Sequence, residues 1–465
     1  METSSLAFLA YGLPACIVLY YLCFFSRPLQ NGVLLLASLV FYAFGQTVYL
    51  PVLAIWILWS WVLGLWIDRR KARGHSGTGV TGLAVVTNVL LLALFRLAGP
   101  LLALAYPSAG GSAPALPTAV PLGLAFFTLQ SVGYCLDVYR GDTPAERNPF
   151  YVGLHLAFFP KLAGGPLTDF TEFRRQLTHR THSTEQLSRG LCRFVLGLSK
   201  KILLAGQLAY LVDFVFNQTS MDNTVVQVPV LLVWLGLLAL CLQFYYELSG
   251  DADMAVGLGL VFGFTLPEQV RAPFQADSLA DFWRRWEITG LGWFRKYLYG
   301  SMPRQENPDM VICSLALVWL CFGLWHGFEW TFLVWGVWNF AVLLSENSFR
   351  HVARIPGGAL RRVYTLLTVA VGFVLLKSPT LYHAGQFFID LLGFGNNAFS
   401  SGFFYAALRE YWAPLFFGVL FVTPVAARFS AFLGRRGRAW RCVAAIGYAA
   451  GLAAMLVLCL AFLAR

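Results

Sequence analysis

One histidine lies among aromatic and aliphatic residues in the stretch CFGLWHGFEWTFLVWGVW, from Cys321 to Trp338. The apolar run before His326, residues 311–325, would measure about 22 Å as a helix at ~1.5 Å per residue. That length is shorter than the ~30 Å hydrocarbon core of a bilayer. We therefore expect the turn at His326 to lie within the depth of a membrane, where desolvation favours the neutral imidazole.

A neutral imidazole can take a proton from a hydroxyl group, so His326 is a candidate general base. Gly327 would let another group approach the backbone closely. The alternative is a histidine that only completes its hydrogen bonds inside an apolar core. The other histidines lie in polar loops or near the ends of apolar runs, at His75, His155, His179, His182, His351 and His383.

A second group of reactive side chains lies in DSLADFWRRWEITGLGWFRKYLYG, residues 277–300, which we expect to form one amphipathic helix over 277–299. Arginine pairs well with phosphate groups, and an acyl-CoA carries several of them. The candidate acyl-CoA site consists of Arg284, Arg285, Trp286 and Lys296. A plain interfacial helix with a basic and an aromatic face is the alternative.

Two further polar clusters lie in apolar segments, where charges are costly and mark either function or an internal ion pair. Gln130 and Asp137 share one side of a helix, and we expect an interhelical hydrogen bond for the first and an Asp137–Arg140 contact. Three acids surround the junction of two apolar runs: Glu247, Asp251 and Asp253. These are expected to cap the next helix or pair with basic residues of the following segment. A metal site is disfavoured because hard cations need a fuller oxygen cage.

The elements that must position these residues are membrane helices. The chain has 465 residues, of which 58% are hydrophobic and 12% charged, and its mean hydropathy is +0.64. Soluble domains are nearer half apolar and a quarter charged. The sequence therefore predicts an all-α, polytopic membrane protein. Its first apolar run is expected to be a retained helix, because it lacks the basic lead of a signal peptide.

The net charge of +11 comes from basic residues that collect in short segments between the apolar runs. This asymmetry is typical of the positive-inside rule. It favours contact with anionic lipid headgroups and argues against a nucleic-acid partner. The cysteines lie mostly inside apolar runs, with no spacing that fits a zinc site, so they are expected to be packing residues.

Placing the basic segments in the cytoplasm predicts about ten to twelve crossings within one membrane-embedded domain, residues 1–465. The expected spans lie near 6–25, 31–48, 51–67, 80–98, 121–139, 187–215, 228–246, 311–325, 330–349, 361–377, 412–433 and 442–464. Glycine and proline interrupt 150–170, which is expected to form a re-entrant helix pair. Glycine also interrupts 252–264. A Pro/Gly/Ser/Ala-rich loop is expected at 99–120. Because the broken segments cluster in one part of the chain, an inverted-repeat transporter is disfavoured.

Four segments occur in a fixed order: FFPKLAGGPL, ELSGDADMAVGLGLVFGFTLPE, FWRRWEITGLGWFRKYLY and LWHGFEWTFLVWG. Together they resemble the membrane-bound O-acyltransferase family, in its branch of bacterial alginate O-acetyltransferases. Related members modify cellulose or peptidoglycan, or export D-alanine to teichoic acid. The resemblance, strongest over roughly residues 30–350, implies a helical bundle with a central tunnel and a catalytic core over 150–350. It also places the family's near-invariant histidine on His326.

The resemblance implies an inner-membrane acetyltransferase that uses cytoplasmic acetyl-CoA, with no permanently bound cofactor and no metal, to O-acetylate an exported polysaccharide such as alginate. A periplasmic acetyltransferase and a polysaccharide synthesis complex are the implied partners. The chain departs from the family pattern at Glu287, where a second histidine is usual, and at Lys296, where an aspartate is usual. Glu287 could orient His326, replace the missing ring, or be neutral drift. Cellulose or peptidoglycan acetylation, an anion or precursor transporter, and an inactive scaffold remain alternatives.

Overall fold

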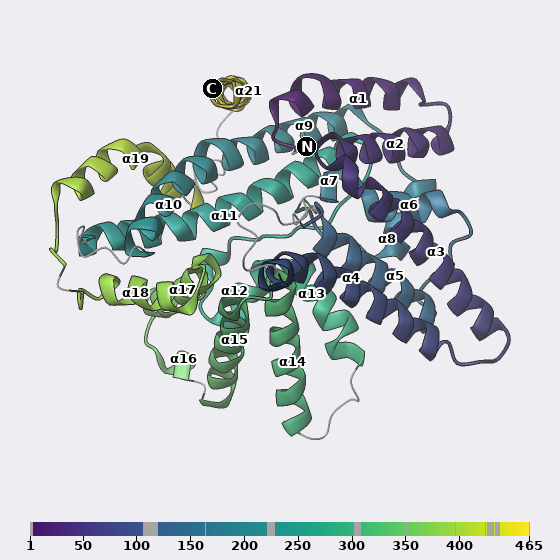
Figure 1. The fold of residues 1–465 in the computed structure, drawn as a ribbon. Coiled ribbons are helices and arrows are strands. Elements are labelled where there is room, and N and C mark those ends of the chain that lie inside the picture. The colour runs from purple at the N-terminus through teal and green to yellow at the C-terminus, as the bar shows by residue number, and fades with distance from the viewer. Residues whose placement is uncertain are drawn as a thin grey trace. The chain divides into compact units, whose positions relative to one another are not determined.

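In the structure, a computed structural model, the regular secondary structure of the described residues consists of helices (Figure 1). The described residues are 3–105, 120–162, 164–220, 228–301, 308–349, 351–395, 397–423, 425, 432 and 438–464. Most of the loop expected at 99–120 lies outside them. The chain divides into two compact units. One comprises Met1–Arg193, Met254–Pro267 and Arg295–Gly300, and the other comprises Phe194–Asp253, Glu268–Phe294 and Ser301–Arg465.

The first unit is built on the N-terminal helices. In chain order these are a π-helical turn (Phe8–Gly12), α1 (Leu13–Leu22), α2 (Arg27–Gln46), α3 (Leu50–Ala72), α4 (Thr78–Ala105), α5 (Leu124–Arg140), α6 (Pro149–Ala157), α7 (Phe159–Leu162) and α8 (Phe170–Thr178). Helices α3, α4 and α5 pack against one another. Gly64 of α3 permits this approach, because a Cβ there would collide with the ring of Tyr134 on α5. The interruption expected in 150–170 is present between α6 and α7, where Pro160 cannot continue the α6 hydrogen bonding.

The second unit contains the C-terminal helices. After α9 (Thr184–Ser199) come a π-helical turn (Lys200–Ala205), α10 (Gly206–Ser220), α11 (Val230–Val261), α12 (Leu279–Arg285), α13 (Ile288–Tyr297), α14 (Pro308–His326), α15 (Trp330–Phe349), α16 (His351–Arg354), α17 (Gly358–Lys377), α18 (Leu381–Leu391), α19 (Gly402–Val422) and α21 (Arg438–Leu463). Helices α9, α11 and α13 each continue across the boundary between the units.

Helices α14 and α15 lie side by side as a close pair (Figure 1). Two glycines make this possible. A Cβ at Gly323 would lie 2.6 Å from the carbonyl oxygen of Phe332, and one at Gly336 would lie 2.7 Å from that of Trp319. Small residues at such positions let helix backbones approach closely in a membrane.

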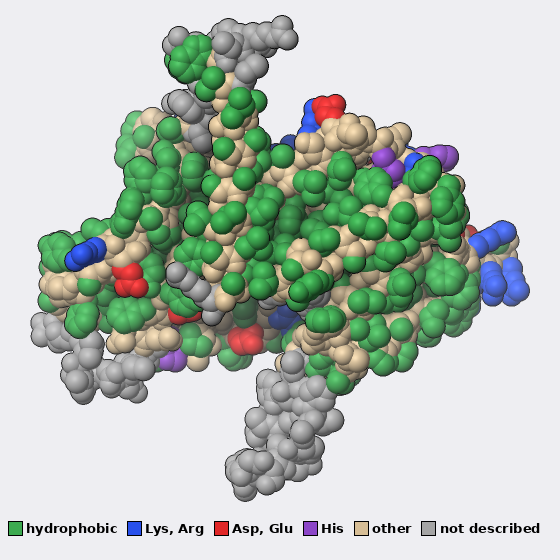
Figure 2. Space-filling model, turned by 90° about the horizontal axis from the view of Figure 1, so that it is seen from above, with side chains coloured by type: hydrophobic (Ala, Val, Ile, Leu, Met, Phe, Trp, Pro, Cys, Tyr) green, Lys and Arg blue, Asp and Glu red, His purple; other side chains and the backbone are tan. Residues whose placement is uncertain are grey.

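Within the described part of the chain, seven helical stretches are long and apolar enough to cross a bilayer. They are Arg27–Ala72, which contains α2 and α3, Thr78–Ala98, Thr184–Thr219, Val230–Val261, Asp309–His326, Gly358–Lys377 and Val443–Leu463. Hydrophobic side chains also dominate the face shown in Figure 2. The chain is therefore a multi-pass membrane protein, whereas the count of ten to twelve crossings stays a prediction.

The prediction of two separate segments at 228–246 and 252–264 is wrong, because α11 is one continuous helix of 32 residues. The acids at the expected junction therefore cap nothing. Lys200 Nζ lies 2.5 Å from Asp253 Oδ2, and Lys201 Nζ lies 2.8 Å from Asp251 Oδ1 and 3.2 Å from Glu247 Oε1. The expected ion pairing is present, but with lysines of the preceding segment.

The last part of the chain also differs from the expected spans. Helix α19 covers Gly402–Val422 instead of 412–433. It begins earlier because Ser401 caps it, accepting a hydrogen bond from the Phe403 amide. Arg409 and Glu410 lower the local hydropathy at the beginning of this helix. The hydropathy pattern therefore predicted a later start. The short helix α18 was not predicted at all.

Candidate active site

His326 is the last residue of α14, and aromatic rings surround it. The ring centroids of Phe322, Trp325 and Trp335 lie 5.0, 4.9 and 5.3 Å from that of the imidazole, all edge-on. Its side chain is still 25% exposed. A histidine sealed in a core would be closed to any substrate, so this partial opening is a requirement for the predicted base.

The turn after His326 admits only glycine at position 327. The Gly327 amide donates a hydrogen bond to the Gly323 carbonyl at 3.2 Å. A Cβ at Gly327 would collide with the Phe332 ring and with the Glu329 carboxylate. The groups that approach the Gly327 backbone closely are therefore Phe332 and Glu329, which follow it in the chain. Their packing fixes the end of α14 and with it the position of the imidazole.

Glu287 faces His326 from the junction of α12 and α13. Its Oε2 lies 3.5 Å from Nε2 of His326, and its side chain is 12% exposed. Sequence reasoning expected one continuous helix over 277–299, and this is wrong. The helix breaks because Glu287 adopts a left-handed backbone with φ of +45°, a conformation that costs a residue with a Cβ about 1–3 kcal/mol.

Two backbone hydrogen bonds hold this strained junction in place. The Arg271 amide donates to the Arg285 carbonyl at 2.8 Å, and the Ile288 amide donates to the Gln269 carbonyl at 3.0 Å. The segment before α12 thus clamps both sides of Glu287. Strain of this kind persists only where surrounding structure enforces it, and it concentrates at functional sites.

A buried amide supports the aromatic wall behind His326. Trp283 donates from Nε1 to Asn339 Oδ1 at 2.9 Å, and Asn339 donates from Nδ2 to the Trp335 carbonyl at 2.9 Å. All three side chains are buried. Sequence reasoning missed Asn339. The available signal was the amide of Asn339, four residues after Trp335, in the otherwise apolar stretch 332–344.

Three residues of the predicted acyl-CoA site, Arg284, Arg285 and Trp286, belong to the second compact unit. Arg284 and Arg285 both pair with Asp281, at 3.1 and 2.9 Å, and their side chains are 64% and 36% exposed. Trp286 is buried and stacks on Phe282 with ring centroids 5.4 Å apart. It therefore anchors the end of α12 that carries the two arginines.

Lys296 belongs to the other compact unit and makes its contacts there. Its Nζ lies 3.0 Å from Asp137 Oδ1 and 3.2 Å from Asp169 Oδ2. Burial lowers the pKa of Lys296, but the hydrogen bonds and charges of the two carboxylates raise this pKa above its usual value. Tyr297 also donates to Asp137, at 2.8 Å. The partner expected for Asp137 was Arg140, whose guanidinium instead lies over the Tyr297 ring.

A buried polar cluster around Lys161 was not foreseen either. The Lys161 ammonium donates to Gln130 Oε1 at 2.8 Å and to Thr168 Oγ1 at 2.7 Å, and it lies 3.4 Å from His155 Nδ1. The interhelical hydrogen bond expected of Gln130 is therefore present. Its partner lies in the FFPKLAGGPL segment, whose lysine gave no signal of burial in the sequence.

Comparison with known proteins places this site in a recognised context. Residues 148–377 match the sequence profile of MBOAT, the membrane-bound O-acyltransferase family. The chain is 35% identical over 405 residues to the probable alginate O-acetylase AlgI of Azotobacter vinelandii, covering 85% of this chain and 79% of the relative. Identity to that of Pseudomonas aeruginosa is 34% over 404 residues, covering 85% and 75%. The peptidoglycan O-acetyltransferase of Helicobacter pylori is 30% identical over 349 residues, covering 69% and 65%.

Proposed function

Because the chain belongs to the membrane-bound O-acyltransferase family, we propose that it transfers acetyl groups to the hydroxyls of an exported polysaccharide of the alginate kind. The alginate O-acetylases match most of its length. The observation that carries the chemistry is the pairing of His326 with Glu287 beside a partly open aromatic wall. Both residues lie inside the segment that matches the family profile.

The proposed reaction is a direct acyl transfer. The His326 imidazole accepts the proton of an acceptor hydroxyl, and the hydroxyl oxygen attacks the carbonyl carbon of the acetyl thioester. The carbon–sulfur bond then breaks, and the coenzyme A thiolate takes up the proton from the imidazolium. Glu287, 3.5 Å from Nε2, stabilises the positive charge that forms on the ring between these steps.

The donor is proposed to be cytoplasmic acetyl-CoA. Its phosphates would bind Arg284 and Arg285, whose guanidinium groups are partly exposed, while Trp286 holds the end of α12 in place. A tunnel through the helical bundle would lead the acetyl group to His326. We place the protein in the bacterial inner membrane, with a periplasmic acetyltransferase and a polysaccharide synthesis complex as its partners in polymer acetylation.

The test determines which cellular polymer carries acetyl ester in the presence and in the absence of this protein. A strain lacking this gene is expected to lose acetyl ester from its exopolysaccharide and to regain it when the wild-type chain is restored. Mass analysis of the purified polymer measures the ester. Unchanged polymer acetylation in the deletion strain would refute the assignment.

Peptidoglycan is the second candidate acceptor, favoured by the 30% identity to the Helicobacter pylori enzyme. Loss of acetyl ester from the muropeptides of the deletion strain, with the exopolysaccharide unchanged, would select it. Purified protein that consumes no acetyl-CoA but moves a solute into liposomes would instead select the transporter.

A further inference from the structure

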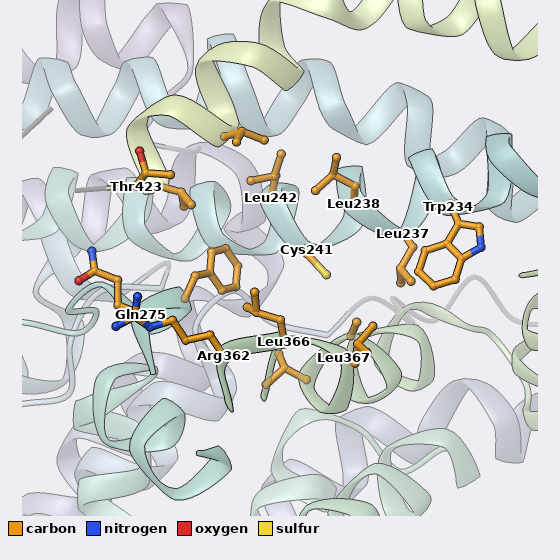
Figure 3. A pocket seen from close by; sticks show the side chains of 15 residues that line it. Trp234, Leu237, Leu238, Cys241, Leu242, Gln275, Arg362, Leu366, Leu367 and Thr423 are labelled. Atoms are coloured by element: carbon orange, nitrogen blue, oxygen red, sulfur yellow. The ribbon is translucent and has the colours of Figure 1, made fainter. Parts of the chain in front are cut away.

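An apolar groove lies between α11, α17 and α19, and its lining includes neither His326 nor Glu287 (Figure 3). All three helices contribute from within one compact unit. The cavity measures about 450 Å³. Its walls are mostly apolar, with Leu238 and Leu242 on α11, Leu366 and Leu367 on α17, and Val419 on α19.

The groove is open from the side. The exposed fractions of Leu238, Leu367 and Val419 are 44%, 49% and 42%. Helices α11 and α17 are both long and apolar enough to cross a bilayer, so we expect Leu238 and Leu367 to face its hydrocarbon core. Hydrocarbon is the solvent there, and an open apolar groove is filled by lipid chains because it offers water no hydrogen bonds.

The two ends of the groove differ in polarity. Gln275, Arg362 and Thr423 lie at one end and Trp234 at the other (Figure 3). The Trp234 indole is fixed by a hydrogen bond from Nε1 to the Leu391 carbonyl at 3.1 Å. Along α11, the eight residues after Trp234 reach Leu242 and span about 12 Å. The groove is thus an elongated apolar cavity with polar side chains at one end.

The polar end carries a positive charge that an anion can reach. Arg362 pairs through Nε with Asp277 at 3.1 Å, and the two side chains are 52% and 45% exposed. Exposed pairs of this kind are weak, and the remaining guanidinium N–H groups are suited to a phosphate. Arg354 and Arg361 lie nearby in the sequence, in the basic segment predicted to face the anionic lipid headgroups of the cytoplasmic leaflet.

We propose that this groove is a binding site for one anionic phospholipid, with an acyl chain along α11 and α17 and the phosphodiester at Arg362. The apolar length selects a lipid over a free anion, and the single guanidinium selects an anionic headgroup over a zwitterionic one. The proposal is independent of the acetyl-transfer function, since it assigns the groove no role in the reaction.

The experiment measures lipid bound to the purified full-length protein. Phosphatidylglycerol or phosphatidylcholine with the same acyl chains is added in mixed micelles, and native mass spectrometry counts the bound molecules. We expect wild-type protein to retain phosphatidylglycerol preferentially. Arg362→Gln is expected to lower that retention about tenfold, the effect of losing one charge-assisted hydrogen-bonding group. Leu366→Trp, which fills the groove from its open side, is expected to lower retention of both lipids.

Matched controls separate the site from general effects. Arg354→Gln removes another arginine of the same basic segment, and Leu360→Trp adds the same ring to α17 outside the groove lining. Both are expected to retain phosphatidylglycerol like wild type. Equal retention of the two lipids by wild type, unchanged retention in Leu366→Trp, or release of the lipid by inorganic phosphate alone would each overturn the proposal.

Discussion

The Nε2 atom of His326 lies 3.5 Å from the Oε2 atom of Glu287, and the two residues come from different helical segments. His326 ends α14, whereas Glu287 stands in the strained junction between α12 and α13. The resemblance of the sequence to the family implies a second histidine at the position where this chain has Glu287. The Glu287 carboxylate can therefore stabilise a charged His326 imidazole by its negative charge. A neutral histidine at position 287 would carry no such charge.

Replacing His326 by alanine is expected to lower the acetyl-transfer rate by a factor on the order of 10²–10⁴, the usual contribution of a general base. His326→Gln should be equally slow, because an amide cannot take up the hydroxyl proton. Turnover of acetyl-CoA by the purified protein, together with polymer acetyl ester in cells, measures the effect. His75→Ala, at an exposed loop position, is the control and should match wild type. Wild-type turnover by His326→Gln would end the assignment of the base.

Replacing Glu287 by glutamine keeps the shape of the side chain but removes its charge. If the carboxylate stabilises the imidazolium, turnover should fall about 10- to 100-fold, corresponding to a charge-assisted interaction of about 1.5–3 kcal/mol. The KM for acetyl-CoA should change little, since the donor phosphates are assigned to the arginines. Glu287→His restores the usual family residue and should retain more activity than the glutamine variant. Equal activity of wild type and Glu287→Gln would instead support neutral drift.

Replacing Glu287 by glycine tests the backbone strain separately from the chemistry. Glycine adopts a φ of +45° without the penalty paid by other residues. Glu287→Gly should therefore keep or raise the thermal unfolding midpoint while lowering turnover. Ile288→Gly, one residue on and inside α13, should lower the midpoint through the ~1 kcal/mol cost of glycine in a helix. Equal losses of stability in the two variants would show that the junction stores no strain.

The sequence predicted apolar helices around His326 because hydropathy and helix length depend on local composition, and the position of this residue within the membrane stays a prediction. It could not reveal the break at Glu287, because no glycine or proline marks it. The left-handed turn is enforced by two non-local hydrogen bonds, one donated by the Ile288 amide to the Gln269 carbonyl and one donated by the Arg271 amide to the Arg285 carbonyl. For the same reason the sequence could not identify the partners of the acids of α11, because those lysines lie far away along the chain in the preceding segment. Local pattern predicted that they pair, but only the fold determines with which residues.

Asn339 is expected to stabilise the aromatic wall behind the imidazole without touching the reacting atoms. Asn339→Ala leaves the buried indole N–H of Trp283 without its acceptor, which should cost about 1–3 kcal/mol. Asn339→Asp keeps an acceptor oxygen for Trp283 and is the matched comparison. The thermal unfolding midpoint in detergent measures both. A midpoint unchanged by the alanine variant would show that the hydrogen bond contributes nothing to stability.

Lys296 compensates the charge of Asp137, whose side chain is fully buried. Lys296→Met should therefore destabilise the protein. Breaking a fully buried pair costs about 3–5 kcal/mol. The cost here should be nearer 1–3 kcal/mol, because the lysine is 35% exposed and Tyr297 still donates to the carboxylate. Adding Asp137→Asn removes the uncompensated charge, so the double variant should recover most of the lost stability. If the double variant were as unstable as the sum of the two single variants, the ion pair would not be the cause, because coupled residues give non-additive changes.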